Sequence, residues 1–407
     1  MSEATEAAGG RRATALDAEI RPFRLEIPQA DLDDLHQRLD HTRWPDELPG
    51  VGWAYGAPLG YVRELTDYWR NRYDWRANEQ RLNEFPQFTT TIDGQRVHFL
   101  HVRSREPGAM PLIITHGWPG SVAEFMQIIG PLTDPPGSFA GDPADAFHVV
   151  APSIPGFGPS GPTGDAGWDR RRVTNAFVEL MRRLGYRRYG AHGGDWGAGI
   201  SRDLGLIDPE HVAGVHVTML GSALPRHELE PAEMAELSEA DQERVRESLR
   251  RWARWNREGV GYGMIQSTRP QTLAYGLTDS PVGQLAWIVE KFKEWTDSSE
   301  RPEDAVDRDQ MLTNVSLYWF TATAGSSARL YYEAAHGGGW GAPEEPSVTP
   351  TGVAVFPREI SLPIRPLAER TNAIIHWSEF DRGGHFAAME EPDLLIADVR
   401  EFFRGLR

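Results

Sequence analysis

Apolar positions recur at helical spacing in the first quarter of the chain and change to strand-like runs further on. The stretch PQADLDDLHQRL at 28–39 places its three leucines on one face of a helix, and YVRELTDYW at 61–69 repeats this three- and four-residue spacing. We therefore predict that residues 21–95 form a helix-rich N-terminal segment.

Short apolar runs of strand length follow from residue 96 onward. They are RVHFLHV (96–102), PLIITHGW (111–118), FHVVAPSIPGF (147–157), RYGAHGG (188–194) and VAGVHVTML (212–220). An amphipathic helix, VTNAFVELMRRLG at 173–185, ends on a glycine between the third and fourth runs. Such alternation is typical of an α/β fold in which a mostly parallel sheet is flanked by helices on both faces.

The alternation stops after about residue 220 and resumes near the end with GVAVFPREI (352–360) and NAIIHWSEF (372–380). The segment between is polar, helical and rich in tryptophan, and some of these indoles are expected to line an apolar pocket. A sheet interrupted late by helices indicates an enzyme core with a helical lid. The predicted divisions are a mobile N-terminus (1–20), a helix-rich extension (21–95), the first part of the core (96–224), the lid (225–345) and the second part of the core (346–407).

Composition narrows the possible functions. The 407 residues carry 42 Lys and Arg against 59 Asp and Glu, a net charge of −17 that argues against a nucleic-acid partner. There are no cysteines, which excludes disulfides, thiolate catalysis and thiolate metal sites. The first twenty residues hold no apolar run long enough for a signal peptide or membrane anchor, so we expect a cytoplasmic protein.

The stretch GAHGGDWGAGIS at 190–201 has the pattern of a nucleophile elbow, a sharp turn from a strand into a helix. Gly193 and Gly197 stand two residues before and two after Asp195, where a strained turn needs small residues. The helix N-terminus would favour the ionised carboxylate at this point. On this stretch alone, Asp195 fits a helix N-cap as well as a nucleophile.

The stretch THGWPGS at 115–121 resembles the loop that donates one backbone N–H to the oxyanion hole of α/β-hydrolases. The donors would then be the N–H groups of Trp118 and of Trp196, the residue after the elbow aspartate. The motif is weak by itself, but its place some eighty residues before an elbow strengthens it.

A base and an acid should follow the nucleophile in this chain order. His385 lies in DRGGHFAAMEEPDLL, a glycine-containing loop between the last predicted strand and the C-terminal helix, and it is the expected base. Glu359, at the end of GVAVFPREI, is the expected acid that orients the imidazole. Glu379 and Asp381 remain alternatives for the acid.

With these residues in place, the chain resembles the epoxide hydrolases of the α/β-hydrolase fold, in the branch with an N-terminal domain that includes the microsomal and juvenile-hormone enzymes. The motifs that carry the resemblance are RPFRLEIPQADLDDL, TRWP, THGWPGS, GGDWG, TGVAVFPREI and RGGHFAAMEEP. The resemblance assigns Asp195 as nucleophile, Glu359 as acid and His385 as base. It also implies two lid tyrosines that hold the epoxide oxygen.

Those tyrosines match Tyr262 in EGVGYGMIQSTRP and Tyr331 in SSARLYYEA, with Tyr332 as an alternative to the second. The membrane-bound relatives carry an N-terminal anchor that this chain lacks, which implies a hydrophilic member. Some soluble bacterial relatives act in natural-product pathways, including enediyne assembly, so the resemblance allows either detoxification or biosynthesis.

The implied reaction converts a small apolar or aromatic epoxide and water to a vicinal diol, without metal or cofactor, in a monomer or homodimer. A haloalkane or haloacid dehalogenase would share the aspartate and the histidine, and an inactive ligand-binding homologue would share the fold. A serine esterase lacks its elbow serine, because Ser201 falls in the helix beyond the elbow.

Overall fold

The computed structural model of the protein describes residues 19–135, 141–225, 227–337 and 345–407. The expected mobile N-terminus lies outside these ranges except for its last two residues, and Trp340 of the expected lid lies outside them too. Within these ranges nine strands form one sheet, in the order β1-β2-β3-β5-β4-β6-β7-β8-β9.

The pairs β1–β2, β2–β3 and β3–β5 are antiparallel. The remaining neighbours, β5–β4, β4–β6, β6–β7, β7–β8 and β8–β9, are parallel. The strands are β1 (Arg21–Phe23), β2 (Gln87–Ile92), β3 (Gln95–Val102), β4 (Met110–Thr115), β5 (Phe147–Pro152), β6 (Tyr189–Gly193), β7 (Val212–Val217), β8 (Ser347–Val355) and β9 (Asn372–Glu379). The predicted mostly parallel sheet is confirmed, and each apolar run cited above overlaps one of its strands.

Two strands were missed within the segment expected to be helix-rich. β2 is a threonine-rich run that forms a hairpin with β3 through Asp93 and Gly94, both with positive φ (51° and 75°). Its strand state depends on pairing with β3, because its own sequence has no continuous apolar run. The expected boundary at residue 95 therefore falls in a hairpin, and the N-terminal extension contributes strands to the core sheet.

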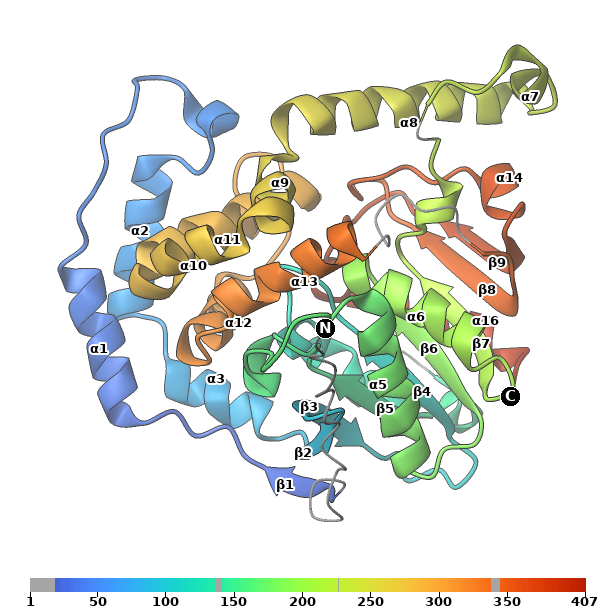
Figure 1. Ribbon diagram of the computed structural model, residues 1–407, viewed down its shortest axis with the longest axis horizontal. Coiled ribbons are helices and arrows are strands. Elements are labelled where there is room, and N and C mark those ends of the chain that lie inside the picture. The colour runs from blue at the N-terminus through green and yellow to red at the C-terminus, as the bar shows by residue number, and fades with distance from the viewer. Residues whose placement is uncertain (1–18, 136–140, 226, 338–344) are drawn as a thin grey trace, which may run out of the picture.

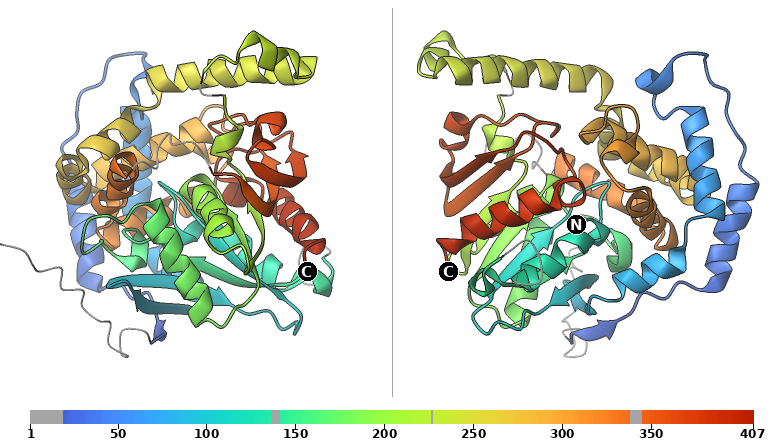
Figure 2. Two further views of the ribbon diagram at one scale, coloured as in Figure 1. Left: turned by 45° about the vertical axis from the view of Figure 1, so that its right-hand side comes forward. Right: turned by 180° about the vertical axis from the view of Figure 1, so that it is seen from behind.

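Helices cover both faces of the sheet (Figure 1; Figure 2). α5 (Arg170–Arg183) and α6 (Asp195–Ile207) lie on one face, and α16 (Pro392–Arg404) lies on the other beside α4 (Ile129–Thr133). Two short helices complete this part of the chain: α14 (Arg365–Ala368) lies between β8 and β9, and α15 (Ala387–Glu390) lies between β9 and α16.

Helices form the expected lid in its described residues, and three helices lie beside the two strands of the N-terminal extension. The lid holds α7 (Pro231–Ala235), α8 (Glu239–Glu258), α9 (Gly261–Thr268), α10 (Pro270–Asp279), α11 (Pro281–Trp295), α12 (Arg308–Phe320) and α13 (Ala324–His336), and the extension holds α1 (Gln29–Asp40), α2 (Leu59–Asn71) and α3 (Trp75–Leu82). Short 3₁₀ turns lie at Gly52–Tyr55, Val122–Gln127, Pro143–Asp145, Gly158–Ser160, Gly221–Ala223 and Pro302–Asp304. None of the helices in the described ranges combines the length and the apolar character needed to cross a membrane.

The extension packs against the lid through buried polar contacts. In α2, the Trp69 indole donates a hydrogen bond of 3.0 Å to the Ser316 hydroxyl of α12. Just beyond α2, the hydroxyls of Tyr73 and Thr313 lie 3.0 Å apart. The partners in each bond are about 240 residues apart in the chain. These bonds therefore hold the N-terminal extension against the lid helix α12.

The close approach of α16 to the sheet depends on glycines in three neighbouring strands. A Cβ atom at Gly190 in β6 would lie 2.4 Å from the Phe403 ring, and one at Gly214 or Gly352 would meet Leu406 or Phe402 at 2.5 and 2.7 Å. Real Cβ contacts are not this short, so these side chains rest directly on the strand backbones.

We expect Gly190→Ala to lower the free energy of unfolding by about 1–3 kcal/mol, because the added methyl group forces Phe403 away from the sheet. Urea unfolding followed by circular dichroism measures the change. The matched control is Gly108→Ala, where a Cβ meets no atom within 4 Å. Equal stabilities of the two variants would contradict this account of the packing.

Candidate active site

The elbow between β6 and α6 places Asp195 in a strained backbone conformation. Its φ is 49°, in the left-handed region that residues other than glycine rarely adopt. A Cβ at Gly193 would lie 2.3 Å from the Gly197 carbonyl oxygen, and one at Gly197 would lie 1.9 Å from the Thr115 oxygen. The turn is therefore tight enough to require both glycines. The N-cap of α6 is Gly194, so the structure does not place Asp195 as the helix cap that the sequence left open.

The Asp195 carboxyl group lies against two backbone N–H groups. The Trp118 N–H donates a 2.8 Å hydrogen bond to its Oδ1, and the Trp196 N–H donates to the same carboxylate. Burial raises the pKa of Asp195, whereas the His385 charge and these two donors act to lower it. A Cβ at Gly117 would lie 2.2 Å from Oδ1, so the loop needs a glycine to come this close.

His385 connects Asp195 to a second buried carboxylate. Its Nδ1 lies 2.7 Å from Glu359 Oε1, and its Nε2 lies 3.6 Å from Asp195 Oδ2. Burial lowers the pKa of His385, but Glu359 and Asp195 outweigh it and raise the pKa to about 9. The two other acid candidates are elsewhere: Glu379 pairs with an arginine at 2.7 Å, and the Asp381 side chain is 91% exposed.

Two lid tyrosines face this pair of charges. Tyr262 in α9 stacks on the Trp118 indole with ring centroids 4.9 Å apart, and Tyr331 in α13 meets the Trp196 ring edge-on at 4.9 Å. The two tyrosine side chains are hydrogen-bonded to each other. Burial raises the pKa of both phenols, and the Asp195 charge raises it further. The alternative, Tyr332, instead stacks on a histidine ring at 4.0 Å.

Three further side chains lie around the site: Trp295 is one of the lid tryptophans expected to line a pocket, whereas Lys291 and Glu124 were missed. Trp295 packs edge-on against the rings of His385 (5.0 Å) and Tyr262 (5.3 Å). The Lys291 ammonium lies 4.5 Å from the centre of the Tyr262 ring, and a lysine on the apolar face of α11 was a detectable signal. Glu124 follows the Trp118 loop; burial raises its pKa to about 8, with the Asp195 charge adding to the rise and His385 opposing it.

The structure thus gathers a carboxylate, an imidazole–carboxyl pair, two N–H donors and two phenols in one place. They come from the loop after β4, the elbow, the loops after β8 and β9, and two lid helices. Within the described ranges no group of three or more His, Asp and Glu side chains is placed to hold a metal ion. The gathered groups can supply a nucleophile, a base and two proton donors.

Comparison with known proteins places this arrangement in a family. The family model described as the epoxide hydrolase N terminus matches residues 20–125, and that of the alpha/beta hydrolase fold matches residues 110–274. A protein of Stigmatella aurantiaca is 46% identical over 95% of this chain and 86% of its own length. Epoxide hydrolase 1 of Sus scrofa is 37% identical over 97% of this chain and 90% of its own.

Solved structures give the same result. The juvenile hormone epoxide hydrolase of the silkworm Bombyx mori superposes with a TM-score of 0.86 at 30% identity, covering 96% of both chains. The epoxide hydrolase of Aspergillus niger superposes with a TM-score of 0.82 at 30% identity, covering 97% of this chain and 98% of its own.

Asp195→Asn should lower the pKa of His385 by about one unit or more, because the substitution removes a negative charge that raises it. An NMR titration of the imidazole, assigned with His385→Gln, measures the change. Asp381→Asn is the control, since this exposed carboxylate makes no contact with His385. An unchanged pKa in Asp195→Asn would show that the two groups are not electrostatically coupled.

Proposed function

The chain belongs to the epoxide hydrolases of the α/β-hydrolase fold, and we propose that it opens its substrate through an ester formed on Asp195. The observation that carries this proposal is a carboxylate at the elbow, held by the Trp118 N–H at 2.8 Å and lying 3.6 Å from His385. An elbow serine would attack a carbonyl carbon. A carboxylate is a weak base, but it can displace the oxygen of a strained epoxide at a saturated carbon.

In the first step one Asp195 oxygen bonds to an epoxide carbon while the bond from that carbon to the ring oxygen breaks. The ring oxygen needs a proton, because an alkoxide is a poor leaving group. Tyr262 and Tyr331 are the proposed donors. Tyrosine phenols are protonated at neutral pH, and these two are buried beside Asp195 and hydrogen-bonded to each other, which supports this role.

In the second step water hydrolyses the ester. Alkylation removes the Asp195 charge, so the pKa of His385 falls; the imidazolium proton returns to the phenolate left by ring opening, and the neutral imidazole can act as a base. His385 takes a proton from water, which attacks the Asp195 carboxyl carbon, and Glu359 stabilises the imidazolium. The oxyanion forms on Asp195 itself, between the N–H groups of Trp118 and Trp196. Loss of the diol restores the carboxylate.

The aromatic lining of the site favours an apolar or aromatic epoxide as substrate. The Trp118 ring lies at centroid distances of 4.9 Å from Tyr262, 5.9 Å from Tyr331 and 6.3 Å from Trp295. The Tyr262 and Trp295 rings are 5.3 Å apart. Water is the second substrate. An apolar wall next to one carboxylate and two phenols matches a hydrocarbon that carries a single polar oxygen.

A dehalogenase would use the same aspartate and histidine but has less support. A halide leaves without a proton, so the paired phenols of Tyr262 and Tyr331 would have no task. The Trp196 side chain, which could hold a departing halide, is hydrogen-bonded to Tyr331. Ser201, the nearest serine beyond the elbow, is buried within α6 and does not replace the nucleophile.

Isotope labelling tests the ester directly. In a single turnover of styrene oxide with excess enzyme in ¹⁸O-water, we expect an unlabelled diol and one ¹⁸O atom in Asp195, because water attacks the enzyme's carboxyl carbon. Mass spectrometry of the diol and of the Asp195 peptide measures the label. Label in the first-turnover diol would exclude the covalent route.

His385→Gln should stop the reaction at the ester, since the variant keeps the nucleophile and the proton donors but lacks the base. Intact mass spectrometry should show the protein heavier by one substrate molecule, at Asp195. The control is the double variant Asp195→Asn/His385→Gln, which should form no adduct. A His385→Gln protein that turns over freely, or never forms an adduct, would contradict the assigned roles.

A further inference from the structure

The loop that carries the Trp118 N–H is fastened by side chains of the lid helix α12. Asn314 Nδ2 donates a 2.7 Å hydrogen bond to the Pro119 carbonyl oxygen, and the Tyr318 hydroxyl donates a 2.7 Å bond to the Gly120 carbonyl oxygen. The Ser121 hydroxyl donates in turn to Asn314 Oδ1 at 2.7 Å. Three consecutive loop residues are therefore tied to α12 directly after the oxyanion donor.

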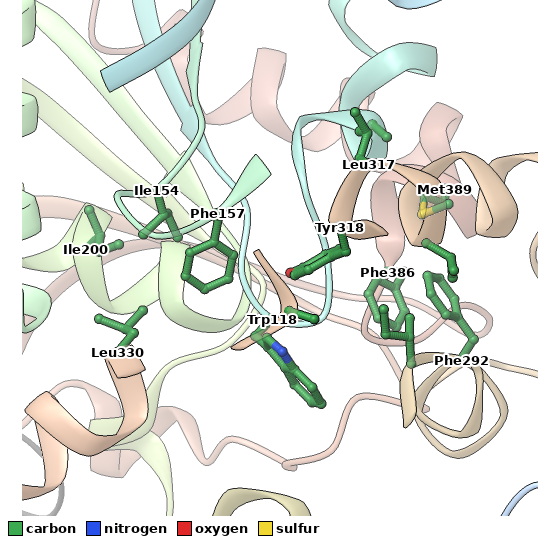
Figure 3. Packing of buried hydrophobic residues seen from close by; sticks show 14 of the residues in the cluster. Trp118, Ile154, Phe157, Ile200, Phe292, Leu317, Tyr318, Leu330, Phe386 and Met389 are labelled. Carbon is green, nitrogen blue, oxygen red and sulfur yellow. The ribbon is translucent and has the colours of Figure 1, made fainter. Parts of the chain in front are cut away.

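These bonds are made out of contact with water. Asn314 is 0% exposed, Tyr318 1% and Ser121 2%. Asn314 and Tyr318 are four residues apart in α12, so they project from one face of the helix towards the loop. Figure 3 shows Tyr318 beside Trp118 and Phe157 in this buried cluster. A buried carbonyl or hydroxyl that loses its partner is costly in free energy, so the loop is held strongly in this position.

Ser121 connects the hydrogen bonds of Asn314 to the 3₁₀ turn that follows the loop. Its hydroxyl accepts a 3.2 Å hydrogen bond from the Ala123 N–H as the N-cap of the 3₁₀ turn Val122–Gln127, while donating to Asn314. The asparagine amide is consequently fixed in orientation, with its nitrogen on the carbonyl and its oxygen on the hydroxyl.

The opposite side of α12 is held by the N-terminal extension through the Trp69–Ser316 and Tyr73–Thr313 hydrogen bonds of 3.0 Å each. The extension touches α12, and α12 touches the oxyanion loop. Hydrogen bonds on two sides of α12 thus connect the extension, through the helix, to the backbone carbonyls of Pro119 and Gly120.

We propose that Asn314, assisted by Tyr318, is a positioning residue that aims the Trp118 N–H at Asp195, and that the N-terminal extension acts on catalysis through α12. The inference rests on the proposed ester mechanism. The hydrogen bonds from α12 to the loop should matter mainly for ester hydrolysis, because the oxyanion arises on Asp195 only when water attacks the ester. A displaced Trp118 N–H therefore slows hydrolysis more than ring opening.

The test measures the two half-reactions separately. Rapid acid quench and intact mass spectrometry follow the rise and decay of the Asp195 ester with styrene oxide in the full-length protein. We expect Asn314→Leu to slow ester decay about 10- to 100-fold, because removing one oxyanion donor outright costs about 10²–10³ in rate. Ring opening should change less than about threefold by the same argument, since no oxyanion forms on the carboxylate in that step.

Further variants separate positioning from folding. Tyr318→Phe removes one hydroxyl and should slow ester decay in the same direction by a smaller factor. Asn314→Asp should restore decay at low pH, where burial keeps the carboxyl neutral and able to donate to the Pro119 oxygen, and should lose it as pH rises. Thr313→Val, which cuts one bond to the extension, should also slow ester decay selectively.

The matched control is Ser327→Ala, which removes a buried hydroxyl of α13 that donates to the Ala324 carbonyl at 3.0 Å, away from the loop. It should leave the ratio of the two rates unchanged. If Asn314→Leu leaves the ratio of the ring-opening rate to the ester-decay rate unchanged, the inference is overturned. A wild-type enzyme that forms no ester would instead overturn the proposed function, and the two failures are thereby distinguished.

Discussion

The Asp195 side chain is only 13% exposed, and an ionised carboxylate with so little water around it needs donors and opposite charge nearby. Two backbone N–H groups and one imidazole meet that need. Each is supplied by a different part of the chain: the loop after β4, the elbow itself and the loop after β9. These loops follow the carboxyl ends of the parallel strands β4, β6 and β9, so the strand topology brings their groups to this one charge.

The same charge governs the other titratable groups of the site. It raises the pKa of His385 together with Glu359, and it raises the pKa of Tyr262 and Tyr331. A group covalently bound to the Asp195 carboxylate would remove its charge, and with it the charge's effect on the pKa values of His385, Tyr262 and Tyr331. In the proposed mechanism, formation of the ester would therefore lower the pKa of the His385 base and of the two phenols in the same step.

Much of the fold and of the elbow turn was predictable from the sequence, because both follow from local patterns of residues. The alternation of apolar runs predicted the parallel sheet, and the glycine spacing around Asp195 predicted a tight turn that the structure contains. β2 was missed because its threonine-rich run becomes a strand only through pairing with β3. Asn314 was missed for a stronger reason: its partners Pro119 and Ser121 lie 195 and 193 residues away, and nothing near it in sequence marks it.

Trp118 serves the site twice, through its backbone N–H towards Asp195 and through its indole under the Tyr262 ring. Every amino acid except proline supplies an N–H, so the two contributions respond differently to change at this position. A substitution there alters the aromatic packing around the Tyr262 phenol while leaving the N–H donor to Asp195 in place. Only a change to the backbone itself, such as an ester in place of the amide before residue 118, removes the donor and spares the ring.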